Sequence, residues 1–275
     1  MKKTFSFLTS NPEFYPTLFK VSLPIILQGF LSTALTFVDV LMVGQLGATS
    51  VASVGLGNQF TLIYIMLVNG IASGAGIFTA QYWGKRYVKH IRQTFGIGLR
   101  FCLLAGILFT TCTIIFSRQI ISFYTHDTFV IEQGGHYLQL VSISYIFFAV
   151  TVAYASVLRS TRLVILPLIA SITALSINTM LNYGLILGHF GFPALGITGA
   201  GISMVIARII ECSIIVITTK VRKIPTIRNV RALIRGKSSL QKKYFKVALP
   251  VIIHSMGWVL GIAMYTRIYA SISTS

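Results

Sequence analysis

Asp39 is the residue with the clearest chemical potential, because its carboxyl group follows a long apolar run. Residues 21–38 contain no charged side chain. A carboxylate inside a membrane helix costs about 2.5–3.5 kcal/mol on insertion scales, so such residues usually face the helix bundle and serve a transport pathway. Counted from Lys20 at about 1.5 Å per residue, Asp39 lies roughly 28 Å along its helix. Asp39 is therefore either a group that binds a cation or a proton, or an interfacial carboxylate near a helix end.

Two asparagines share one face of a later helix. Asn178 and Asn182 are spaced i, i+4, and residues with this spacing are neighbours on a helix surface. Counted from Arg162 at about 1.5 Å per residue, they lie roughly 24 and 30 Å along that helix, in the same layer as Asp39. One carboxylate with amide oxygens is a hard-oxygen set that suits Na⁺, and the same carboxylate can instead carry a proton. The alternative role for the asparagines is hydrogen bonding between helices.

A second pair of charges and one proline also fall within apolar segments. Arg208 and Glu211 are spaced i, i+3, so they are predicted to form a structural ion pair. Pro24 lacks a backbone N–H and can kink a helix. It is a candidate hinge that moves Asp39, although a proline near a helix start often leaves the helix unbent.

Residues 70–74 begin and end with glycine, which predicts a face where helices pack closely.

The elements that position these residues are membrane helices. Hydrophobic residues make up 55% of the 275 positions and charged residues 10%, whereas a soluble domain carries about 25% charged residues. A spanning helix needs about 20 mainly apolar residues. The chain is therefore predicted to be an all-α polytopic protein whose main partner is the lipid bilayer. Seven spans are expected, near 18–43, 55–80, 96–117, 136–158, 163–187, 197–219 and 246–271.

The basic residues indicate orientation. The net charge is +18, but nearly all Lys and Arg residues lie between the apolar runs, which argues against nucleic-acid binding. Alternate loops are rich and poor in Lys and Arg, and basic loops are retained in the cytoplasm. The N-terminus and loop 220–245 are therefore predicted to be cytoplasmic in an inner-membrane protein. The loops near residues 47, 126 and 192 are predicted to face outward.

An internal repeat indicates two lobes. The stretch Phe19-Lys20-Val21-Ser22-Leu23-Pro24-Ile25-Ile26-Leu27-Gln28 recurs as Phe245-Lys246-Val247-Ala248-Leu249-Pro250-Val251-Ile252-Ile253-His254, with six of ten residues identical. Six spans separate the copies, so both helices enter from the same side, as in a parallel repeat. The expected organisation is a six-helix lobe at 1–219, a basic linker at 220–245, and the first helix of an incomplete second lobe at 246–275. A complete second copy needs roughly another 180 residues.

In this order, several stretches resemble the multidrug and toxic compound extrusion (MATE) family of cation-coupled exporters. They are Leu23-Pro24-Ile25, Phe37-Val38-Asp39-Val40-Leu41-Met42-Val43-Gly44, Ala80-Gln81-Tyr82-Trp83-Gly84-Lys85, Leu158-Arg159-Ser160 and Asn182-Tyr183-Gly184-Leu185-Ile186-Leu187-Gly188. The resemblance runs over about residues 18–270. It implies two six-helix lobes around a central cavity, and export of organic, often cationic compounds driven by inward Na⁺ or H⁺.

The resemblance also implies a coupling site at Asp39, Asn178 and Asn182. The position of Asn182 is Asp in some members, so this chain has one acid fewer, which disfavours a relay of two carboxylates. A threonine found early in helix six of the family aligns with Met204, and Ser203 is the nearby hydroxyl. No cofactor is implied beyond the coupling ion.

Two other functions remain open. One is a flippase for lipid-linked precursors, a role of related two-lobe folds, which a cavity lined with several arginines would favour. The other is a membrane protein that does not transport, such as a non-functional truncation. An enzyme is not expected, because the sequence contains no nucleophile–base pair, metal cluster or phosphate-binding loop.

Overall fold

The computed structural model describes residues 14–227 and 238–273, and in these ranges every regular element is a helix. The N-terminal segment 1–13 and the middle of the predicted linker, 228–237, lie outside the described residues. The helices are α2 (Phe14–Gly44), α3 (Ala48–Gly84), α4 (Val88–Ser122), α5 (Thr128–Ser142), α6 (Ser144–Ser160), α7 (Ile165–Leu187), α8 (Ile197–Val221) and α9 (Ser238–Ser273). The predicted all-α class is confirmed.

Most expected spans correspond to single helices. Among the described residues, α3, α4, α7, α8 and the Ser239–Tyr265 part of α9 are long and apolar enough to cross a membrane. The first expected span, 18–43, lies inside the 31-residue helix α2. The fourth expected span, 136–158, corresponds to a bent pair of helices. It consists of α5 and α6, which meet at Ile143 with a bend of 46°.

Side chains from other helices satisfy the backbone at this bend. The hydroxyl of Thr110 on α4 donates to the Ser142 carbonyl at 2.8 Å. The hydroxyl of Tyr64 on α3 donates to the Tyr145 carbonyl at 2.6 Å. A broken helix at membrane depth is tolerated only where the protein supplies such partners. The bend therefore depends on residues distant in the sequence.

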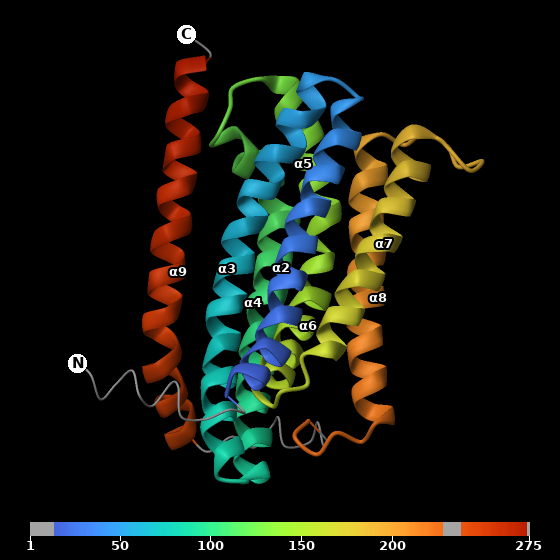
Figure 1. The fold of residues 1–275 in the computed structure, drawn as a ribbon. Coiled ribbons are helices and arrows are strands. Elements are labelled where there is room, and N and C mark those ends of the chain that lie inside the picture. The colour runs from blue at the N-terminus through green and yellow to red at the C-terminus, as the bar shows by residue number, and fades with distance from the viewer. Residues whose placement is uncertain (1–13, 228–237, 274–275) are drawn as a thin grey trace.

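The helices form a central bundle with a helix pair on one side and a single helix on the other (Figure 1). Helices α3, α4, α5 and α6 pack against one another in the centre. The α7–α8 pair packs on α5 and α6, and α2 lies against α7. On the other side of the bundle, α9 packs against α3. The candidate residues thus come from α2, α7 and α8.

The start of α9 fits a groove lined by glycines. A Cβ at Gly74 would lie 2.9 Å from Ala248, and one at Gly70 would lie 2.9 Å from Ile252. Tyr244 is fully buried, and its hydroxyl donates to the Ile71 carbonyl. The close-packing face predicted for residues 70–74 is confirmed, and α9 is the helix that uses it.

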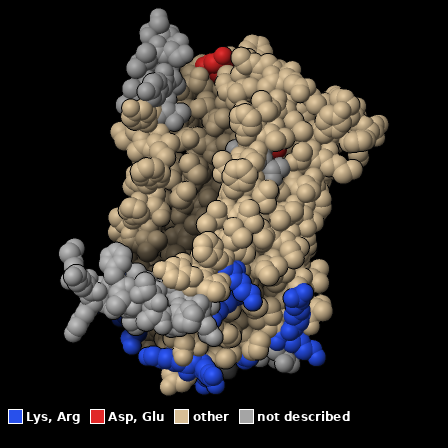
Figure 2. Space-filling model, in the orientation of Figure 1, with Lys and Arg blue, Asp and Glu red and all other residues tan. Residues whose placement is uncertain are grey.

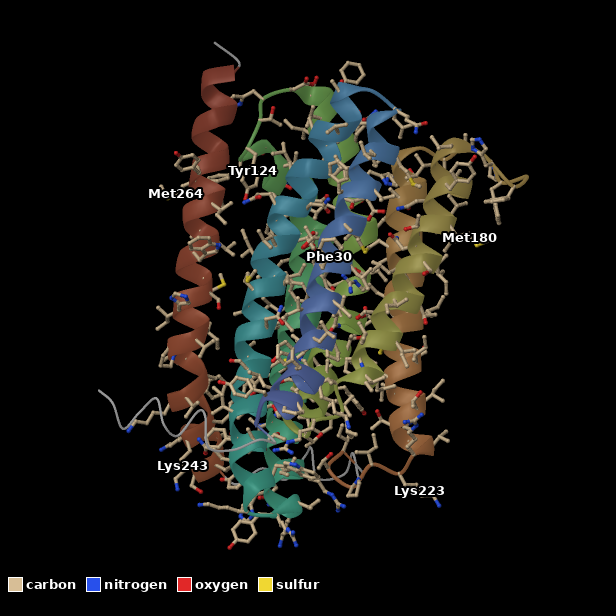
Figure 3. The ribbon with its side chains drawn as sticks, in the orientation of Figure 1. Phe30, Tyr124, Met180, Lys223, Lys243 and Met264 are labelled. Carbon is tan, nitrogen blue, oxygen red and sulfur yellow. The ribbon has the colours of Figure 1, made fainter. Side chains whose placement is uncertain are left out.

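Charge and apolar surface are separated along the molecule. Figure 2 shows Lys and Arg side chains gathered at one end of the visible face, and Lys223 and Lys243 lie at that end in Figure 3. We refer to it as the basic end. Between the two ends, large apolar side chains are exposed, including Phe30 (70%), Met180 (63%) and Met264 (68%) (Figure 3). Such a band is expected of a multi-pass membrane protein, whose outer surface faces lipid.

Candidate functional site

Asp39 lies at the boundary between two cavities. The first, which we call the upper cavity, has a volume of about 350 Å³ and includes Asn58, Tyr137 and Ala200 in its lining. The second, which we call the lower cavity, has a volume of about 370 Å³ and includes Gln28 and Arg159 in its lining. Six residues line both cavities: Asp39, Ile65, Phe148, Asn178, Met204 and Arg208. A group bound at Asp39 is thus accessible from either cavity.

The structure brings Asp39 together with both asparagines. Asn182 Nδ2 donates to Asp39 Oδ1 at 2.6 Å. Asn178 lies one turn away on α7, and Asn182 Nδ2 is 3.4 Å from its Oδ1. Both asparagines are buried, at 5% and 2% exposure, whereas Asp39 is half-buried. The two residues that the sequence placed in the layer of Asp39 do lie beside it.

The amide of Asn178 can face the carboxylate in two ways. With Nδ2 turned toward Asp39, it donates to both carboxylate oxygens, at 3.2 and 3.3 Å. With Oδ1 turned toward Asp39, that oxygen would face the carboxylate oxygens with no donor between them, which is unfavourable while the site is empty. The first arrangement stabilises an empty, charged carboxylate, and the second suits a bound cation.

Asn182 contributes an unused oxygen to the same cluster. Its Oδ1 is buried and has no hydrogen-bond partner among the described residues. A buried polar atom without a partner costs about 1–3 kcal/mol. A cation at Asp39 would offset that cost by taking Asn182 Oδ1 as a ligand, once the amide turns over and gives up its Nδ2 hydrogen bond to Asp39. The cluster therefore holds one carboxylate and two amide oxygens within reach of one site.

A second hydrogen bond ties the same two helices closer to the basic end. Gln28 Nε2 on α2 donates to Ser171 Oγ on α7 at 2.7 Å. Both contacts join residues 143 positions apart in the chain. They are separated by eleven residues on each helix, which is close to three turns at about 3.6 residues per turn. One face of α2 therefore runs along one face of α7 and contacts it at two levels.

The Arg208–Glu211 pair forms and extends this lower contact. Arg208 Nη1 lies 2.7 Å from Glu211 Oε2, and the guanidinium lies 4.9 Å from the centre of the Phe148 ring. Ser171 Oγ donates to Glu211 Oε1 at 2.8 Å. Both oxygens of this carboxylate, which is 4% exposed, thus accept a hydrogen bond. The pair connects α8 to α7 and, through Ser171, to α2.

Ser203 lies differently from expectation, whereas Pro24 lies within a helix as expected. Ser203 is buried, but its hydroxyl donates to the Gly199 carbonyl at 2.8 Å, and it lines neither cavity. Met204 lines both cavities in its place. The structure therefore does not bring the Ser203 hydroxyl to Asp39. Pro24 lies inside α2, which continues through it as a helix.

Sequence reasoning missed the aromatic wall of the upper cavity. Tyr137 OH donates to Asn58 Oδ1 at 3.1 Å, and Tyr145 OH lies 2.8 Å from Thr61 Oγ1. The Tyr64 and Tyr145 rings stack with centroids 4.3 Å apart. Polar-tipped aromatics inside predicted spans were the available signal, because a buried tyrosine hydroxyl needs a partner.

Comparison with known proteins identifies the family. The sequence model of the family described as MatE matches residues 24–184, which is more than half of the chain. The chain belongs to the MATE family. This confirms the resemblance drawn from the sequence. The chain is 24% identical over 258 residues to a probable multidrug resistance protein NorM of Thermotoga maritima, covering 94% of this chain and 55% of the relative.

Other MATE relatives give the same result. A NorM protein of Rhizobium meliloti is 32% identical over 203 residues, which cover 71% of this chain and 43% of the relative. The chain thus spans about half the length of these curated relatives. A transporter structure from Pyrococcus furiosus superposes with a TM-score of 0.81 at 18% identity, over 90% of this chain and 54% of that one. At that identity the likeness shows the fold alone.

Proposed function

We propose that this chain is the first lobe of a cation-coupled antiporter that exports organic, cationic compounds across the bacterial inner membrane. MATE proteins are transport proteins and not enzymes, and curated relatives of this chain are named as probable multidrug resistance proteins. The observation that carries the proposal is the Asp39 carboxylate, which two amides contact at the boundary of two cavities.

Coupling would use two arrangements of the Asp39 cluster. In the empty state the asparagine amides donate to the charged carboxylate. In the occupied state Na⁺ replaces those donors and the amide oxygens turn toward it, or a proton neutralises Asp39 directly. The cation must leave before the amides can return, so the two states are mutually exclusive. Such exclusion is what an exchange mechanism requires, because a ligand shifts an equilibrium only through different affinities for the two states.

Sodium binding to the purified chain in nanodiscs tests this site. Wild type is expected to bind radioactive sodium saturably, and Asp39→Asn to bind none, because the substitution removes the charge but keeps the size. Asn182→Ala should weaken binding about tenfold, since it removes one neutral ligand, worth about 1.4 kcal/mol. Unchanged sodium affinity in Asp39→Asn would contradict the proposal. Wild type without sodium affinity would leave H⁺ as the coupling ion.

The proposed orientation places the basic end in the cytoplasm. It is supported by the Lys and Arg side chains that gather there (Figure 2). After replacement of the three native cysteines, single cysteines at His126 or Phe192 should react with an impermeant thiol reagent added outside intact cells. A cysteine at Val230 should react only after lysis. Labelling of position 230 from outside would reverse the orientation.

The flippase alternative receives limited support. Two arginines, Arg159 and Arg208, line the lower cavity. Arg208 is neutralised by Glu211, so one arginine of the two retains its full charge. Transport of lipid-linked precursors by the full-length protein, unaffected by Asp39→Asn, would favour this alternative over the antiporter.

A further inference from the structure

Arg159 carries a charge that the proposed antiporter mechanism does not use. It lies in the last turn of α6, is half-buried, and lines the lower cavity. The described part of the chain provides no hydrogen bond or ion pair for its guanidinium. The helix dipole favours a cation at this position, but it leaves the five N–H donors of the side chain without acceptors.

The acidic residues of the chain are already committed or lie far from Arg159. There are five in the sequence. Asp127 caps α5 through Phe129 N and Val130 N, and Glu132 pairs with Arg118 at 3.7 Å. Both lie near the start of α5, at the opposite end of the bent α5–α6 span from Arg159. They are too distant to neutralise it.

The two acids at the lower cavity also have partners. Glu211 accepts from Ser171 and Arg208, and Asp39 accepts from Asn182. The fifth acid, Glu13, lies outside the described residues. Among the described residues, therefore, the lower cavity holds one neutralised pair, one carboxylate held by amides, and one guanidinium without a counter-charge.

A buried or half-buried cation without a partner favours an anion from outside the chain. Guanidinium groups bind carboxylates and phosphates in a bidentate manner, and these hydrogen bonds are among the stronger ones in proteins. The cavity volume of about 370 Å³ falls within the range of small-molecule sites, about 300–1,000 Å³. The lower cavity thus combines the space and the charge that such a ligand requires.

We propose that Arg159 makes the lower cavity a binding site for a carboxylate or phosphate group. The molecule that bears this group is either a soluble organic acid or amphoteric compound, or a phospholipid whose headgroup enters the cavity. Asp39 lines the same cavity, but Arg159 and not the Asp39 cluster supplies the group that binds the anion.

Two probes with the same ring and opposite charge test this site. Naphthoate and naphthylmethylammonium are titrated by calorimetry into the purified chain in phosphatidylcholine nanodiscs. Wild type should bind naphthoate, and Arg159→Gln should lower that affinity about tenfold or more, the effect of losing a charge-assisted hydrogen bond. Arg159→Lys should retain most of the affinity because it keeps the charge. Naphthylmethylammonium affinity should not fall in Arg159→Gln.

The control variant is Arg222→Gln, which removes an exposed arginine beyond α8 that lines neither cavity. It should bind naphthoate as wild type does. Unchanged helix content by circular dichroism shows that each variant is folded. The proposal is overturned if wild type does not bind naphthoate, or if Arg159→Gln and Arg222→Gln have the same effect.

A second lipid composition distinguishes the two sources of the anion. The titrations are repeated in nanodiscs that contain phosphatidylglycerol, and the ratio of wild-type to Arg159→Gln affinity is compared. A ratio that falls to one means that the lipid headgroup occupies the Arg159 site in wild type. A ratio that stays high means that the site is open to soluble anions. Either result supports an anion site at Arg159.

Discussion

Helices α2 and α9 share a ten-residue repeat in which six residues are identical, but the two helices have different environments. The start of α9 is fixed in the groove of α3, where Tyr244 is fully buried. At the same offset of 226 residues, α2 carries Leu18, which is 45% exposed. Instead, α2 contacts α7 through Gln28 and Asp39. At the corresponding positions α9 carries His254 and Tyr265.

This difference separates what the repeat shares from what it does not. The shared residues include the proline and lie in the first half of each helix. The unshared residues decide whether the helix is anchored by packing, as in α9, or by polar contacts, as in α2. The carboxylate Asp39 lies on α2, and Tyr265 occupies the corresponding position of α9. We therefore expect substitutions at equivalent positions of α2 and α9 to have unequal effects.

The largest effect is expected at Asp39 and its counterpart. In the full-length transporter, Asp39→Asn should reduce cation-driven efflux to that of vesicles without transporter, with normal membrane insertion. Tyr265→Phe should leave cation-driven efflux near wild type, since it leaves the Asp39 carboxylate unchanged. Dye efflux and protein abundance are measured together. Normal efflux by Asp39→Asn at wild-type abundance would show that Asp39 is an interfacial residue.

The next effect concerns anchoring by packing. Tyr244→Ala should lower the free energy of unfolding by about 3–5 kcal/mol, because it empties a fully buried aromatic site. Tyr244→Phe should cost about 1 kcal/mol, the worth of its hydrogen bond to the Ile71 carbonyl. Leu18→Ala, at the equivalent position of α2, should cost less than either. Denaturation of the purified chain in mixed micelles gives these values. Equal losses for Tyr244→Ala and Leu18→Ala would remove the proposed difference.

The smallest effect concerns the lower polar contact. Gln28→Leu should lower the free energy of unfolding by about 1 kcal/mol through loss of the bond to Ser171. His254→Leu, at the exposed counterpart, should change it by less than about 0.5 kcal/mol. The same denaturation experiment measures both variants. A larger loss for His254→Leu than for Gln28→Leu would indicate that α9 also depends on polar contacts.

The depth of the Asp39 cluster along its helices could be predicted from the sequence, but the full set of residues around it could not. Counting residues from basic helix ends placed Asp39, Asn178 and Asn182 at one depth, because rise per residue is constant in a helix. The contact between Gln28 and Ser171 requires the relative register of two helices, which the pattern of neither helix contains. Ser203 was misplaced because one residue rotates a side chain by about 100° around the axis.

The bend at Ile143 illustrates a second limit. Residues 141–147 contain neither proline nor glycine, so local sequence gives no reason for a break. The carbonyls near it accept hydrogen bonds from Thr110 and Tyr64, which lie on other helices. Tertiary contacts of this kind cannot be inferred from composition or periodicity.

The two contacts between α2 and α7 both lie on the C-terminal side of Pro24. A bend at Pro24 would therefore move the two contacts by different distances. At about 1.5 Å per residue, Gln28 is about 6 Å from Pro24 along the helix and Asp39 about 22 Å. A bend that moves Asp39 by about 3 Å, the length of one hydrogen bond, moves Gln28 by less than about 1 Å. Gln28 can therefore keep its hydrogen bond to Ser171 while Asp39 moves away from Asn182.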